Sequence, residues 1–83
     1  MMFQAQVIQL ATLWHWLVYH THDARRSHAG FPDLVLVRER VVYAELKTDH
    51  GLVAPEQKQW LDALRHAGQE AYLWRPENWD LIK

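Results

Sequence analysis

The chain has 83 residues, a formal net charge of −1 and no cysteine. Its length predicts one domain spanning residues 1–83, and the lack of cysteine excludes disulfides and thiolate metal sites. A nearly neutral charge gives no overall attraction to nucleic acid, so any such contact must come from a local basic patch. The sequence shows neither a secretory signal nor an apolar stretch of membrane-spanning length, which predicts an intracellular protein without a membrane partner.

The N-terminal part of the chain predicts a helix followed by a strand. From Phe3 to about His15, apolar residues recur at helical spacing and indicate an amphipathic helix. The residues expected to face the core are Phe3, Val7, Leu10, Trp14 and Leu17. Residues 16–21 are rich in β-branched and aromatic side chains, which favours a strand.

Two apolar segments at 34–37 and 41–44, joined by a polar turn, predict a β-hairpin. Because hairpin strands are antiparallel, Asp33 at the start of the first should lie beside Glu45 at the end of the second. Glu45 and Lys47 are two residues apart, so their side chains leave the same face of the strand. Two carboxylates and an ammonium therefore converge at one end of the hairpin.

The C-terminal part predicts a helix and a last strand. Pro55 suits the first helical position, and Gly68 follows the expected end at about residue 67. Residues 70–74 read as a strand, and a short turn of helix is expected within 77–82. The order helix, three strands, helix, strand predicts an α/β fold, with a small mixed sheet flanked by helices.

The cluster of Asp33, Glu45 and Lys47 has two interpretations. Carboxylates are costly to place beside an apolar core and repel each other, which suggests that a cation compensates them. Mg²⁺ favours such oxygen ligands and takes one or two protein carboxylates. The plainer interpretation is a surface salt bridge between Glu45 and Lys47, with Asp33 as a turn residue.

The polar loop before the hairpin contains Arg25 and Arg26, whose guanidinium groups suit contact with DNA phosphates. Their alternative role is that of ordinary solvated loop residues. In and next to this loop lie three histidines, namely His20, His22 and His28. Histidine is a common zinc ligand, so a zinc site is possible. Without a helical histidine pair or any cysteine, polar or DNA-facing histidines are the better interpretation.

The motifs that carry a family resemblance are Gly30-Phe31-Pro32-Asp33-Leu34, Glu45-Leu46-Lys47, Gly51 and Pro55-Glu56-Gln57. They resemble the signature of the PD-(D/E)XK nucleases, and in particular the VRR-NUC (virus-type replication-repair nuclease) branch. The resemblance runs from Phe3-Gln4 to about Trp74, which is most of the chain. It implies the nuclease core, with its element order α-β-β-β-α-β.

The resemblance also implies a function, namely an endonuclease that hydrolyses phosphodiester bonds with Mg²⁺ or Mn²⁺. Asp33, Glu45 and the backbone carbonyl of Leu46 would hold the metal ion. Lys47 would position the attacking water or bind the scissile phosphate. Gln57 would support Lys47 or the water. Further implications are a branched or junction-like DNA substrate, a homodimer, and a location in the cytoplasm of a bacterium or phage-infected host.

One departure from the family pattern leaves alternatives open. Relatives carry an acidic residue on the first helix, whereas Met1 and Met2 occupy that region here and no acid precedes Asp23. Either the chain lacks this acid or its start lies upstream. A catalytically impaired module that binds DNA structures is therefore the second hypothesis. The third is a small interaction protein that uses exposed tryptophans and no nucleic acid.

Overall fold

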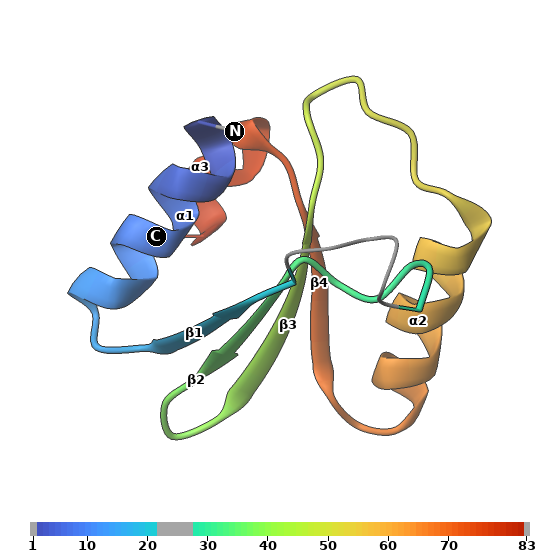
Figure 1. Cartoon of the computed structure of the whole chain (residues 1–83), viewed down its shortest axis with the longest axis horizontal. Coiled ribbons are helices and arrows are strands. Elements are labelled where there is room, and N and C mark those ends of the chain that lie inside the picture. The colour runs from blue at the N-terminus through green and yellow to red at the C-terminus, as the bar shows by residue number, and fades with distance from the viewer. Residues whose placement is uncertain (1, 22–27, 83) are drawn as a thin grey trace.

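The computed structural model describes residues 2–21 and 28–82 (Figure 1). It contains three α-helices, four strands and one 3-10 helix, and the predicted order of the main elements is confirmed. They are α1 (Met2–Leu13), β1 (Leu17–His20), β2 (Leu34–Val37), β3 (Val41–Leu46), α2 (Pro55–His66), β4 (Glu70–Trp74), η1 (Pro76–Asn78) and α3 (Trp79–Ile82). No helix in these two ranges is long and apolar enough to cross a membrane.

The four strands form one mixed sheet in the order β1-β2-β3-β4. β1, β2 and β3 pair antiparallel, with Leu34 opposite Ala44, and β3 and β4 pair parallel, with Glu45 opposite Leu73. A parallel pair needs a long crossover connection, and α2 supplies it. The register of β2 and β3 follows from the short turn at residues 38–40, because the loop length of a hairpin determines which residues stand opposite each other.

The main core lies between the sheet and α1. Phe3, Val7 and Ala11 are buried against side chains of one sheet face, namely Leu34, Leu36, Val42, Ala44 and Leu46. Trp79 and Ile82 of α3 pack against the same cluster. Figure 1 accordingly shows α1 and α3 on one side of the sheet and α2 on the other.

The predicted apolar stripe of the first helix is wrong at its C-terminal end. Trp14 is 58% exposed and Leu17 is 74% exposed, whereas Ala11 is buried. α1 stops at Leu13, and His15 adopts a left-handed backbone with φ of 68°. The chain therefore turns before the next helical position is reached, so the helical spacing of the stripe no longer applies.

The other face of the sheet is covered only over part of its width. α2 packs there against β4, and Leu61 and Ala71 are buried. The Phe31 ring adds edge-to-face contacts with Trp60 and Tyr43, at centroid distances of 5.1 and 6.3 Å. This arrangement places the start of α2 next to the loop that leads into β2.

Candidate active site

Asp33 and Glu45 are brought together at one end of the hairpin. Asp33 immediately precedes β2, and its Oδ2 accepts a hydrogen bond from the backbone N–H of Leu46 at 2.8 Å. The backbone carbonyl of Asp33 accepts a second bond from the N–H of Thr21 at 3.0 Å. The end of β1 and the end of β3 thus fix this residue from two sides.

Glu45 is a carboxylate held inside the protein. It is 2% exposed, and its Oε1 has no hydrogen-bond partner among the described residues. Burial, and then the negative charge of Asp33, raise the pKa of Glu45 to about 8, while Lys47 opposes the shift. A buried acceptor without a donor is costly, so a further positive group would stabilise this pair of carboxylates.

Lys47 points its ammonium group toward this carboxylate pair. Its Nζ lies 3.8 Å from Glu45 Oε2, and its backbone N–H donates to the carbonyl of Trp74 at 3.0 Å. An ion pair of this length leaves Glu45 Oε1 unpartnered. The ion pair between Glu45 and Lys47 is therefore present, and Glu45 Oε1 remains without a hydrogen-bond partner beside it.

The first turn of α2 contacts the loop before Asp33 through Gly30. Gly30 has φ of +90°, and a Cβ atom there would lie 2.4 Å from the backbone carbon of Glu56. Gln57, one residue later, accepts a hydrogen bond on its side-chain Oε1 from the N–H of Ala54 at 2.8 Å. Gln57 thus closes the N-terminus of α2, where Ala54 has no capping side chain. This hydrogen bond gives Gln57 a structural role at the start of α2.

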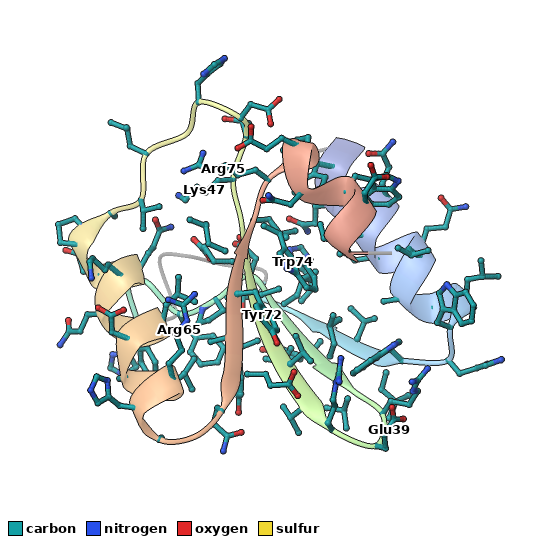
Figure 2. All side chains as sticks on the ribbon, turned by 180° about the vertical axis from the view of Figure 1, so that it is seen from behind. Glu39, Lys47, Arg65, Tyr72, Trp74 and Arg75 are labelled. Carbon is teal, nitrogen blue, oxygen red and sulfur yellow. The ribbon has the colours of Figure 1, made fainter. Side chains whose placement is uncertain are left out.

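Arg75 organises the loop between β3 and α2, a role that sequence reasoning missed. Its Nη1 donates to the carbonyls of Thr48 at 2.7 Å, Gly51 at 2.8 Å and Asp49 at 3.4 Å. Figure 2 shows Arg75 and Lys47 near this loop, at the end of β4. Because the partners are backbone atoms distant in sequence, only the parallel pairing of β3 and β4 could have indicated the contact.

The oxygen atoms at the site suit a hard cation. Within residues 2–21 and 28–82, no group of three or more His, Cys, Asp or Glu side chains could hold a metal ion, which also leaves the zinc hypothesis without support there. Two carboxylates remain, with the carbonyl of Leu46. The N–H of Leu46 points toward Asp33, and its carbonyl leaves the same side of the strand.

Two predicted site residues cannot be placed in this geometry. Arg25 and Arg26 lie outside the described residues, as does His22. His20 is described, and its ring forms a hydrogen bond with the side chain of Gln4 on α1. The part of the site that the structure describes is therefore Asp33, Glu45, Lys47 and the first turn of α2.

Comparison with known proteins identifies the family. The model of the VRR-NUC domain matches residues 5–76. A solved structure described as a VRR_NUC domain protein superposes with a TM-score of 0.64 at 21% identity, covering 86% of this chain and 75% of that chain. Curated protein sequences give no match. The resemblance read from the sequence is thus confirmed, and the chain belongs to the VRR-NUC family, whose domain implies a nuclease-type function on DNA.

Proposed function

We propose that this domain is a divalent-metal-dependent endonuclease that hydrolyses phosphodiester bonds in structured or branched DNA. The observation that carries the proposal is the unpartnered, buried Oε1 of Glu45 beside a second carboxylate. A structural ion pair would satisfy such an atom, whereas a cation-binding site leaves it available. Asp33, Glu45 and the carbonyl of Leu46 would hold Mg²⁺ or Mn²⁺. The bound ion supplies Lewis-acid polarisation of a phosphoryl oxygen and a more acidic water.

The side chains around the proposed metal site have separate roles in the proposed mechanism. Lys47 presents a positively charged amine next to the carboxylates, where it would orient the attacking water or stabilise negative charge on the phosphate. Gln57 accepts a hydrogen bond from Ala54 at the start of α2, and we propose that its amide group supports Lys47 or the water. Arg25 and Arg26 are proposed to hold the DNA backbone, because one guanidinium group can bind two oxygens of a phosphate at once.

The direct test is cleavage of a labelled four-way junction and a matched linear duplex, with Mn²⁺ or with EDTA. Lys47→Met should lower the rate at least 100-fold, because it removes the charge and keeps the length of the side chain. Calorimetry should show that this variant still binds Mn²⁺, since the proposed ligands are intact. Cleavage by Lys47→Met at the wild-type rate would contradict the role given to Lys47, and cleavage in EDTA would contradict metal dependence.

A binding module without catalysis is the second candidate function. One observation favours it, namely that the first turn of α1 carries no acidic residue. In the VRR-NUC pattern that this chain resembles, the first helix carries a carboxylate, and a domain without it would have one metal ligand fewer. This candidate predicts junction binding that weakens steeply with salt, because phosphate contacts release counterions, and no cleavage with Mn²⁺. The absence of Mn²⁺ binding by calorimetry would support it further.

We further propose that the domain acts as a homodimer, as the family resemblance implies. The support lies on the sheet face that α2 leaves uncovered. Val18 faces the core under α1, so its neighbours in β1 point to the opposite face. There Leu17 is 74% exposed and Tyr19 is 63% exposed. Exposed apolar side chains that share a sheet face suit a self-complementary C2 contact, which would give the dimer two active sites.

Replacing Leu17 with glutamate should convert the dimer into monomers. The carboxylate of the new glutamate would lose its water in the dimer contact and would have no positively charged partner there. Burying such a charge in an interface costs several kcal/mol. Leu52→Glu is the matched control, because Leu52 is 89% exposed in the loop before α2. Sedimentation equilibrium of the two variants and the wild type gives the oligomeric state. A Leu17→Glu protein that remains as dimeric as Leu52→Glu would show that this face is not the contact.

A further inference from the structure

An aromatic groove lies on the face of the sheet opposite the candidate active site. Its volume is about 630 Å³, within the range of pockets that hold small ligands. The C-terminal half of α1, the tip of the β2–β3 hairpin, β4 and the C-terminal helices enclose it. Its side chains include Trp14, Trp16, Arg38, Arg40, Tyr72 and Trp74. In Figure 2, Tyr72 and Trp74 extend from β4 toward α1 and α3, away from α2.

The groove presents flat π surfaces. The rings of Tyr72 and Trp74 are parallel to within 9° at a centroid distance of 5.9 Å. Arg38 and Arg40 place their guanidinium groups over the ring of Trp16, at 4.9 and 5.8 Å from its centre. Tyr72 remains 40% exposed, so part of this residue is open to a ligand.

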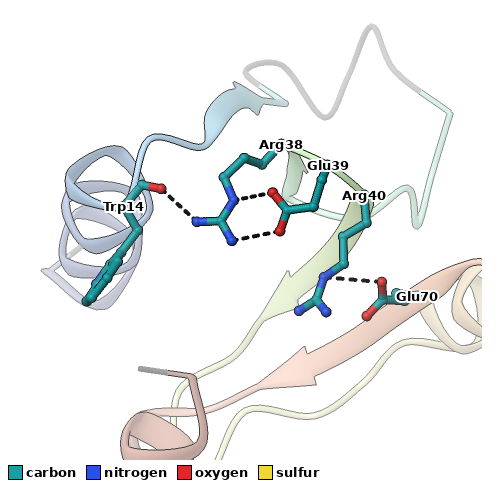
Figure 3. Close-up of polar contacts among 5 residues, drawn as sticks. All are labelled: Trp14, Arg38, Glu39, Arg40 and Glu70. Carbon is teal, nitrogen blue, oxygen red and sulfur yellow. Dashed lines mark hydrogen bonds and ion pairs between the residues drawn. The ribbon is translucent and has the colours of Figure 1, made fainter.

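The charges at the rim of the groove are already compensated. Arg38 forms a two-bond ion pair with Glu39 and donates to the carbonyl of Trp14 at 3.0 Å, and Arg40 contacts Glu70 at 3.3 Å (Figure 3). These acids hold the guanidinium planes in place and cancel their charge. The groove therefore favours a flat, uncharged group over a free phosphate.

We propose that this groove binds unpaired bases of the DNA substrate. Bases stack on aromatic side chains and on guanidinium planes, and such stacking does not require a particular sequence. The proposal rests on the proposed nuclease function, because that function brings DNA to the domain. A peptide segment or a second protein copy would be recognised by its apolar side chains, and neither explains the parallel aromatic and guanidinium surfaces.

The position of the groove restricts the substrate. Trp74 lines the groove, while its backbone carbonyl accepts the hydrogen bond from Lys47 N–H at the active-site end of β3. The two sites lie on opposite faces of the sheet, and β4 is an edge strand. A strand of DNA that occupies both must bend around β4, which a single strand can do and a stiff duplex cannot. The preferred substrate is thus DNA with an unpaired segment next to the cleaved bond.

The test measures binding in EDTA, where cleavage does not interfere. Fluorescence anisotropy should show that the wild type binds a labelled oligothymidylate at least tenfold more tightly than an abasic oligonucleotide of equal length and charge. Tyr72→Ser should lose about tenfold in affinity for the thymidylate and almost nothing for the abasic strand. Tyr72→Phe is the matched control, because it keeps the ring and removes only the hydroxyl that donates to Glu70 at 2.9 Å.

Photo-crosslinking locates the contact independently. An oligonucleotide with 5-iodouracil should crosslink to Trp14, Tyr72 or Trp74 when the peptides are mapped by mass spectrometry. Equal affinity for the thymidylate and abasic strands, or crosslinks confined to the loop around Lys47, would overturn the proposal. A change of oligomeric state in Tyr72→Ser with unchanged DNA binding would assign the groove to a second protein copy. Failure of the nuclease hypothesis is a separate result, because it would appear as no cleavage with Mn²⁺ by the wild type.

Discussion

Glu45→Gln is expected to abolish cleavage and, at the same time, to stabilise the metal-free protein at alkaline pH. Glutamine has nearly the same shape as glutamate but lacks the charge that the proposed metal site needs, so the rate should fall at least 1,000-fold. The same change removes a buried carboxylate that faces Asp33 and has an unpartnered oxygen. Activity and stability should therefore move in opposite directions, which is typical of a functional residue held at a cost to stability.

The pH dependence of stability has a definite sign. The pKa of Glu45 is raised from 4.5 to about 8 in the folded protein, so the native state binds the proton more tightly than the unfolded chain. The free energy of unfolding should therefore fall as pH rises from about 4.5 through about 8. For Glu45→Gln this fall should be absent. We expect a gain on the order of 2–5 kcal/mol over the wild type at pH 9, because one unit of pKa difference corresponds to about 1.4 kcal/mol.

Chemical denaturation between pH 5 and pH 9 in EDTA measures this difference. Glu39→Gln is the control, because Glu39 is an exposed glutamate in the hairpin turn, where its pair with Arg38 lowers its pKa to about 2. Its replacement should leave the slope above pH 5 unchanged, since Glu39 is ionised throughout. Parallel slopes for the wild type and Glu45→Gln would mean that Glu45 is not the buried proton-binding group.

The sequence was sufficient to predict the β2–β3 hairpin and the convergence of charged side chains at its end. The short turn at residues 38–40 determines the register, and one further step beyond the pair of Leu34 and Ala44 places Asp33 opposite Glu45. The second helix and the last strand followed from Pro55, Gly68 and the apolar pattern between them. These features depend on residues close in the chain, where local preferences and burial favour the same structure.

Other features depend on contacts that local patterns do not encode. The end of α1 is set by the left-handed turn at His15, so Trp14 and Leu17 became exposed although their spacing is helical. The three carbonyls bound by Arg75 lie in a loop more than twenty residues earlier. The spacing of Glu45 from Lys47 predicted proximity, but the depth of burial of Glu45 depends on the packing of α2 and β4 around it.

Gly30→Ala is expected to destabilise the protein strongly, and more than Gly68→Ala. The new Cβ would lie 2.4 Å from the backbone carbon and 2.5 Å from the carbonyl oxygen of Glu56. Both contacts are with backbone, so either the loop or the first turn of α2 must move. The left-handed φ of +90° adds strain for any residue other than glycine. We expect a loss of about 3 kcal/mol or more in the free energy of unfolding.

Gly68→Ala separates the clash from the backbone strain. Gly68 has a similar φ of +84°, but a Cβ there meets no atom within 4 Å. Its replacement should cost about 1 kcal/mol, the ordinary penalty for alanine in this conformation. Thermal melts of both variants give the comparison. Because Gly30 contacts the turn that contains Gln57, Gly30→Ala should also lower cleavage at temperatures where it remains folded, whereas Gly68→Ala should cleave at the wild-type rate. Equal losses of stability in the two variants would show that the close contact between Gly30 and the backbone of α2 does not limit which residue fits at position 30.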